Sequence, residues 1–92
     1  MDDILERFRK EAEEILQRIL KEINEAKANA GSFEGFKHYL KLIAQKFEKL
    51  NQALMEKADV YVTNVTSEET RKEIIAAGKE FVKRFMEAVK PK

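Results

Sequence analysis

The chain has 92 residues, of which 43% are apolar and 38% are charged, and its 18 basic and 17 acidic residues leave a formal net charge of +1. This apolar content is too high for a disordered chain, and the near balance of charge excludes the basic surface that binds nucleic acid or anionic lipid. The absence of cysteine excludes disulfides, thiolate metal ligands and a cysteine nucleophile.

The N-terminal part of the chain predicts a long amphipathic helix. Asp2 or Asp3 is a suitable N-cap, and apolar residues then recur on one broad arc as far as Ala30. This acidic start is atypical of a secretory or transit signal, and no apolar run approaches the roughly 20 residues that span a bilayer. We therefore expect a soluble protein, cytoplasmic or recombinant, with no targeting signal and no membrane partner.

Gly31 and Ser32 predict a tight turn into a second helix that runs antiparallel to the first. Gly31 is suited to the left-handed conformation that closes a helix, and Ser32 is suited to the N-cap of the next one. Apolar residues follow with alternating spacings of three and four, which is the pattern of a heptad seam. They are Phe33, Phe36, Leu40, Ile43, Phe47, Leu50 and Leu54. We expect this helix to end near Lys57 or Ala58.

Residues 59–66 predict an apolar connector, because their valines, tyrosine and threonine favour extended backbone and Asn64 favours a turn. Such a connector is at the long end of the range for antiparallel helices, and we expect its valines to cover one end of the bundle. Thr66 then caps a third helix, with Glu69 reaching back to complete a capping box. Pro91 ends this helix.

These elements predict one all-α domain over residues 1–92. Three helices of roughly 35 to 42 Å, at 1.5 Å per residue, are matched for side-by-side packing. The expected fold is an antiparallel three-helix bundle with a longer apolar connector between the second and third helices.

The polar residues offer no catalytic, cofactor or metal site. His38 is the only histidine, and it lies almost opposite the seam, where a solvated surface position is expected. Together with Glu34 it would supply only two ligands, too few for a metal ion. Both serines, Ser32 and Ser67, stand at helix starts, where capping explains them. We therefore expect neither an enzyme nor a bound cofactor.

Gly78 falls among the apolar positions of the third helix, where glycine costs about 1 kcal/mol relative to alanine. One explanation is that a phenylalanine ring from the second helix, Phe36 or Phe47, needs the room. Another is a small apolar cavity between the second and third helices, which would make the protein a small-molecule host. The candidate lining residues of that cavity are Phe47, Tyr61, Ala77, Gly78 and Phe81.

A second, weaker apolar stripe on the second helix is a candidate face for a protein partner or for self-association. It consists of Tyr39, Leu42 and Ala53, which lie outside the main seam. One form of self-association is a symmetric dimer that combines Tyr39 and Leu42 with the strand-like residues 60–65, paired across a two-fold axis.

The whole chain resembles de novo designed helical bundles. The resemblance rests on matched helices, capping motifs, an uninterrupted heptad seam, alternating Glu and Lys, and the absence of Cys and Trp. Residues 60–63 and the helical glycines depart from that style. A small helical protein from a thermophilic microbe would show the same enrichment in Glu and Lys. We expect a non-catalytic scaffold or interaction module, with a small-molecule host and a helical homodimer as the alternatives.

Overall fold

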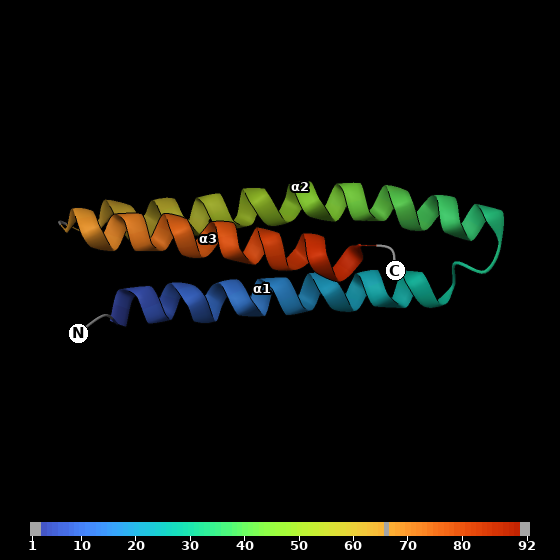
Figure 1. Ribbon diagram of the computed structural model, residues 1–92, viewed down its shortest axis with the longest axis horizontal. Coiled ribbons are helices and arrows are strands. Elements are labelled where there is room, and N and C mark those ends of the chain that lie inside the picture. The colour runs from blue at the N-terminus through green and yellow to red at the C-terminus, as the bar shows by residue number, and fades with distance from the viewer. Residues whose placement is uncertain (1–2, 66, 91–92) are drawn as a thin grey trace.

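The computed structural model describes residues 3–65 and 67–90, and within them the chain forms three helices and no strand. The helices are α1 (Asp3–Ala28), α2 (Phe33–Thr63) and α3 (Glu68–Val89). Each helix packs against the other two, and successive helices run in opposite directions in a rod of 52 × 18 × 18 Å (Figure 1). The prediction of an all-α three-helix bundle is therefore confirmed.

The turn between α1 and α2 is closed by the predicted serine but not by the predicted glycine. The Ser32 hydroxyl accepts a hydrogen bond from the Gly35 amide at 3.0 Å, as expected for an N-cap. No glycine has a positive φ, so the left-handed conformation expected at Gly31 is wrong. The end of α1 tightens instead, because the amides of Asn29 and Ala30 each donate to a carbonyl three residues earlier, at 3.1 Å.

The predicted connector over 59–66 is wrong in most of its length, because α2 continues through Thr63. Tyr61 and Val62 pack against a buried cluster that includes Phe8 of α1, and this packing outweighs the β-propensity of the segment. The helix end is also stabilised locally, since the side chains of Thr63 and Asn64 donate hydrogen bonds to carbonyls four residues earlier, at 2.7 and 2.8 Å. The link to α3 is correspondingly short.

The start of α3 is capped one residue later than predicted. The Ser67 hydroxyl accepts a hydrogen bond from the Thr70 amide at 3.3 Å. The expected roles of Asp2, Thr66 and Pro91 fall outside the described residues.

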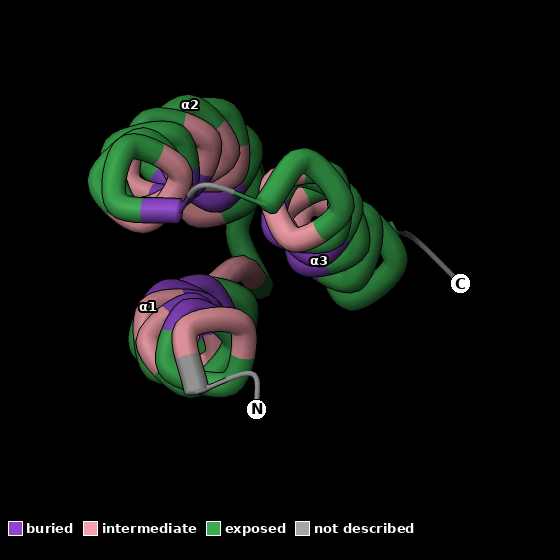
Figure 2. Tube along the Cα trace, turned by 90° about the vertical axis from the view of Figure 1, so that its left-hand side faces the viewer, coloured by how far each residue is buried: buried purple, intermediate pink, exposed green. Residues whose placement is uncertain are grey.

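The core follows the axis of the bundle, and α1 contributes buried residues to it from Phe8 to Ile23. Figure 2 shows the buried residues of all three helices turned toward the centre. The largest fully buried side chains are Phe8, Leu16, Ile23, Leu50, Ile74 and Phe85.

Only the second half of the predicted seam on α2 is buried. Leu50 and Leu54 lie in the core, whereas Phe33 is 75% exposed and Leu40 is 50% exposed. The reason is helix length, because α3 has 22 residues against 31 in α2 and ends before it reaches the turn between α1 and α2 (Figure 1). The first turns of α2 therefore pack against α1 alone, through Tyr39, which is buried although it lies outside the predicted seam.

Candidate functional site

Ion pairs flank both of the interfaces that α1 forms with its neighbours, which we call the α1 seams. All four ion pairs of the described residues involve α1, two toward each neighbouring helix. They are Arg9–Glu80 and Glu13–Arg84 toward α3, and Glu11–Lys57 and Glu22–Lys46 toward α2.

Hydrogen bonds accompany these ion pairs between α1 and its neighbours. Arg84 binds both carboxylate oxygens of Glu13, at 2.6 and 3.0 Å, and this contact holds the pKa of Glu13 below its usual 4.5. The hydrogen bond from Lys46 likewise lowers the pKa of Glu22. The Tyr61 hydroxyl donates to Glu11 at 2.6 Å, and that bond raises the pKa of Tyr61. Charged and polar contacts thus flank the buried side of α1 both toward α2 and toward α3.

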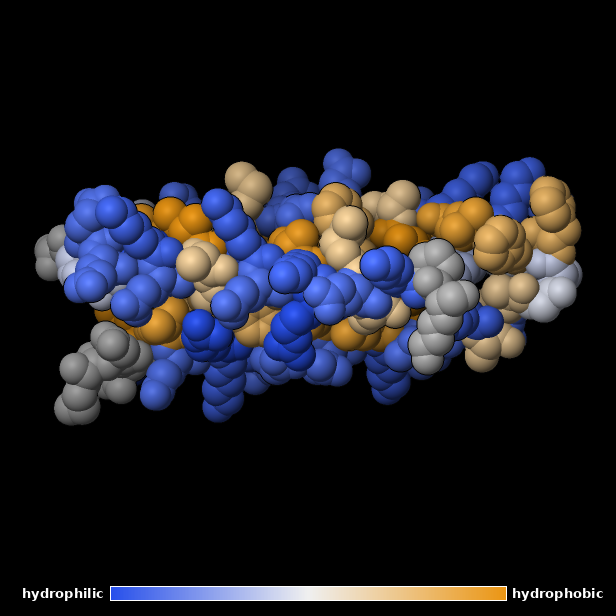
Figure 3. All heavy atoms as spheres, in the orientation of Figure 1, coloured by the Kyte–Doolittle hydropathy of each residue, from blue (hydrophilic) through white to orange (hydrophobic). Residues whose placement is uncertain are grey.

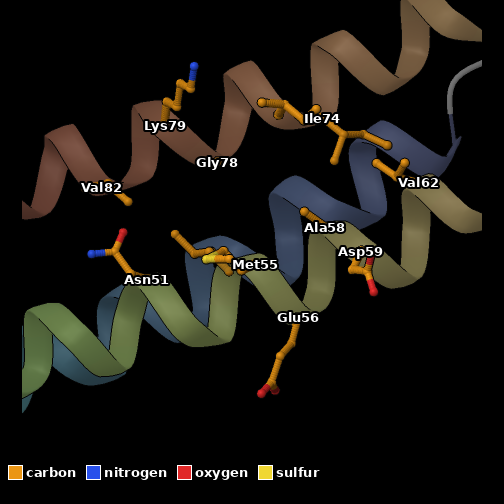
Figure 4. Close-up of a pocket in the computed structure, with 12 residues that line it drawn as sticks. Asn51, Met55, Glu56, Ala58, Asp59, Val62, Ile74, Gly78, Lys79 and Val82 are labelled. Atoms are coloured by element: carbon orange, nitrogen blue, oxygen red, sulfur yellow. The ribbon is translucent and has the colours of Figure 1, made fainter.

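The outer side of α2 and α3 is different, because it carries an apolar groove of about 670 Å³. Its apolar walls include Met55, Ala58 and Val62 of α2 and Ile75, Gly78 and Val82 of α3. Figure 4 shows α1 behind this groove and the side chains of Met55, Val62 and Val82 directed into the space between the two helices. Among the described residues no ion pair joins α2 to α3 across it.

The walls of the groove expose large apolar side chains. Met55 is 72% exposed, Ile75 is 50% exposed and Met86, further along the same side of α3, is 52% exposed. Burial of such side chains is the usual outcome when a neighbouring element is present. Their exposure on both helices marks a surface that lacks a neighbour within the described chain.

Exposed apolar side chains continue beyond the groove toward the turn between α1 and α2. The described residues expose seven large apolar side chains, namely Phe33, Phe36, Leu40, Met55, Val60, Ile75 and Met86. At about 100° per residue, all of these except Val60 lie on the sides of α2 and α3 that border the groove or its extension. Figure 3 shows apolar atoms along the upper part of the rod and at this end of the molecule. We call this surface the outer apolar face.

Beside the groove, the two edges of the outer apolar face carry opposite charges. Glu48 and Asp59 lie on the α2 edge, whereas Lys72, Lys79 and Lys83 lie on the α3 edge, and all five residues are exposed. None of the five belongs to the ion pairs of the described residues. Beside the groove, the α2 edge is therefore acidic and most of the α3 edge is basic, with Glu68 at its start. The extension of the face toward the turn instead carries Lys41 and Lys37, whose ammonium lies over the Phe33 ring.

Of the residues predicted to line a pocket, the structure places only Gly78 in the groove. Ala77 and Phe81 are buried in the core, and Phe47 packs against Phe85 with 6.2 Å between ring centroids. Tyr61 faces α1, where its ring meets that of Phe8 edge-on. Four of the five predicted lining residues are thus misplaced.

The explanation expected for Gly78 is also corrected. A Cβ atom at Gly78 would meet only the Cζ atom of Phe8 of α1, at 3.7 Å, and not a ring from α2. The groove residues Ile75 and Val82 belong to the apolar positions of α3 among which Gly78 falls. Their spacing on α3 matches that of a buried side, and sequence alone does not separate a covered side from an open one.

The predicted partner face on α2 is wrong for Tyr39. Tyr39 is only 9% exposed, and Leu42 packs against the core. Ala53 is half-buried. The strand-paired dimer is wrong as well, because residues 60–63 are helical. His38 is exposed, as predicted, and Glu34 is exposed as well. No group of three side chains that could hold a metal ion occurs in the part of the chain that the structure describes.

No protein-family model, no curated protein and no solved structure matches this chain. Across the described residues, no helix combines the length and the apolar character needed to cross a membrane.

Proposed function

We propose that the protein is a non-catalytic interaction module that binds an amphipathic α-helix in the groove between α2 and α3. The observation that carries this proposal is the contrast between seams. The α1 seams end in ion pairs, whereas the α2–α3 seam presents Met55 and Ile75 to solvent on its two walls. Association that covers such apolar surface is favourable by about 25 cal/mol per Å².

The shape and chemistry of the groove suit a helix. A helix that docks between two others places apolar anchors at intervals of three, four and seven residues along one side. Gly78 leaves the α3 wall without a side chain between Ile75 and Val82, so a docked backbone can approach closely there. Met55 and Met86 are unbranched and adapt to partners of different shape.

The polar groups that catalysis would need are occupied elsewhere or dispersed. Ser32 and Ser67 accept helix-cap hydrogen bonds from backbone amides. Within the groove lining, Figure 4 shows the carboxylate of Glu56 and the ammonium of Lys79 directed away from the space between the helices. A small-molecule host is the weaker proposal, because most of its predicted lining residues lie in the core or against α1.

A titration with a synthetic helix tests the proposal. The probe is a fluorescein-labelled peptide of three heptads with Leu at positions a and d and Glu and Lys elsewhere, and binding is followed by fluorescence anisotropy. We expect the protein to bind this peptide, and we expect Met55→Glu and Ile75→Glu each to weaken binding by about tenfold or more, because each places a charge in the apolar contact.

Val60→Glu is the matched control. Val60 is 59% exposed, similar to the groove residues, but it lies about 140° around α2 from Met55 at 100° per residue. Its substitution is expected to leave the affinity unchanged. Equal affinities of the wild type, Met55→Glu and Ile75→Glu, or no binding at all, would overturn the proposal, provided that circular dichroism shows all variants folded.

A further inference from the structure

We infer that the helices docking on the outer apolar face come from a second copy of this chain. The α2 and α3 helices of the two copies then form an antiparallel four-helix bundle around a two-fold axis that runs parallel to the helices. This inference rests on the proposed function, since it uses the same groove. It adds the identity of the partner and the geometry of the assembly.

The charges at the edges of the face select this arrangement. A two-fold axis parallel to the helices places α2 of one copy over α3 of the other. The acidic edge of Glu48 and Asp59 then meets the basic edge of Lys72, Lys79 and Lys83 of the second copy, and the same contact repeats on the other side. A two-fold axis across the helices would instead place α3 over α3 and bring the lysines of the two α3 edges together, which is unfavourable.

The register of the helices brings these charges to the same height. Phe47 of α2 packs beside Phe85 of α3, and the two helices are antiparallel. A residue of α2 and a residue of α3 therefore lie at the same height along the rod when their numbers add up to 132. A two-fold axis parallel to the helices preserves height along the rod, so this register also relates α2 of one copy to α3 of the other.

Glu48 is then level with residue 84 and Asp59 with residue 73. Each is one residue from a lysine of the second copy, Lys83 and Lys72 respectively. An offset of one residue is about 1.5 Å along the axis, which a lysine side chain spans.

The exposed end of α2 fits the same assembly. The helix α3 ends before the first turns of α2, and in this arrangement α3 of the second copy ends at the same height (Figure 1). Both copies leave a space there beside the two-fold axis. Phe33 and Leu40, which are 75% and 50% exposed, lie on the side of α2 that faces this space. The two copies would bury these side chains against each other.

The size of the face is close to what a stable dimer requires. Helix α3 has 22 residues, so the face is about 33 Å long at 1.5 Å per residue. The rod is 18 Å wide. These dimensions give roughly 600 Å² in projection, which is about three quarters of the roughly 800 Å² per partner of standard interfaces.

Charge reversal combined with sedimentation equilibrium tests the inference on the full chain, from about 5 μM to 1 mM. The wild type is expected to show a monomer–dimer equilibrium. Reversal of the acidic edge (Glu48→Lys with Asp59→Lys), or of the basic edge (Lys72→Glu with Lys83→Glu), should raise the dissociation constant by about tenfold or more, because every edge contact becomes repulsive. The variant that combines all four substitutions should dimerise again, since its edges are once more complementary.

The control for net charge is Glu14→Lys with Glu25→Lys on α1, where both residues are exposed. It changes the net charge as much as the acidic-edge reversal and should leave the dimer intact. A wild type that remains monomeric at 1 mM would overturn the inference, and peptide binding would still decide the proposed function separately. Failure of the four-substitution variant to recover would overturn the parallel two-fold axis, as would a dimer that neither edge reversal weakens.

Discussion

The α1 seams and the outer apolar face are both formed by amphipathic helices, but they differ in the burial of their apolar residues and in the pairing of the charges beside them. Along α1, apolar residues are buried and the flanking charges pair with charges on α2 or α3. Along the outer side of α2 and α3, apolar residues reach solvent and the flanking charges have no ion-pair partner in the described chain.

In a helical bundle, the charges beside an interface between two helices indicate whether a further partner can bind there. An interface whose flanking charges form ion pairs within the chain has no room for a further partner, because that partner would have to break those ion pairs. A seam with apolar walls and free edge charges offers a partner both surface to bury and charges to match. The three predictions below test that distinction.

The largest expected effect separates the two regions by their contribution to folding. Phe8 on α1 is fully buried beside Tyr61, so Phe8→Ala should lower the free energy of unfolding by about 3–5 kcal/mol. Met55→Ala on the outer apolar face should change it by less than about 0.5 kcal/mol in the monomer. Urea unfolding at low micromolar concentration measures both values. Comparable losses would mean that the outer face already belongs to the core of the monomer.

A pair of glycines gives effects of opposite sign. Gly78→Ala should raise the free energy of unfolding by about 0.5–1 kcal/mol, because the added Cβ meets only the Phe8 ring at 3.7 Å and alanine is the better helix former. Gly35→Ala should lower it by about 1–3 kcal/mol, because its Cβ would lie 2.5 Å from the Asn29 carbonyl oxygen. Thermal melts followed by circular dichroism check the signs. A loss at Gly78 would show that the groove wall is more tightly packed than the structure indicates.

The smallest expected effect on the free energy of unfolding concerns the ion pairs that flank the α1 seams. Glu13→Gln should lower the free energy of unfolding at pH 7 by less than about 1 kcal/mol, because the Glu13–Arg84 pair is partly exposed and screened by solvent. The pKa of Glu13 is lowered in the folded state, so the contribution is present above the unfolded value near 4.5 and is lost as pH falls through the folded value.

Urea titrations of wild type and Glu13→Gln at pH 7 and pH 3 measure this change. The difference between the two proteins should be smaller at pH 3 than at pH 7, because Glu13 becomes protonated as the pH falls. Glu48→Gln, at the edge of the outer apolar face, is the control and should match the wild type at pH 7 in the monomer, because Glu48 forms no ion pair with another described residue. A difference at pH 7 as large for Glu48→Gln as for Glu13→Gln would remove the contrast between the seams.

Much of the fold was predictable because it depends on local interactions. Ser32 is followed by an apolar period of 3.6, so the start of α2 and the antiparallel turn follow from capping and periodicity. The end of α2 was not predictable in the same way. Val60 to Thr63 favour strand by local propensity, and the packing of Tyr61 and Val62 against α1 makes them helical.

The candidate site was predictable only in its general position. Gly78 indicated the interface of α2 and α3, which is where the groove lies. The predicted partners of Gly78 were wrong because helical periodicity states which residues share a side and not which helix that side meets.

Three amphipathic helices, the cap at Ser32 and the absence of a cysteine-based site follow from the amino-acid sequence alone, since they depend on neighbouring residues and on composition. Which apolar residues are covered depends on how the three helices pack. Phe33 and Leu50 belong to one uninterrupted seam, yet the first is exposed and the second is buried. The physical reason is that burial depends on whether another helix is long enough to lie opposite, and that is a property of the whole bundle and not of the seam.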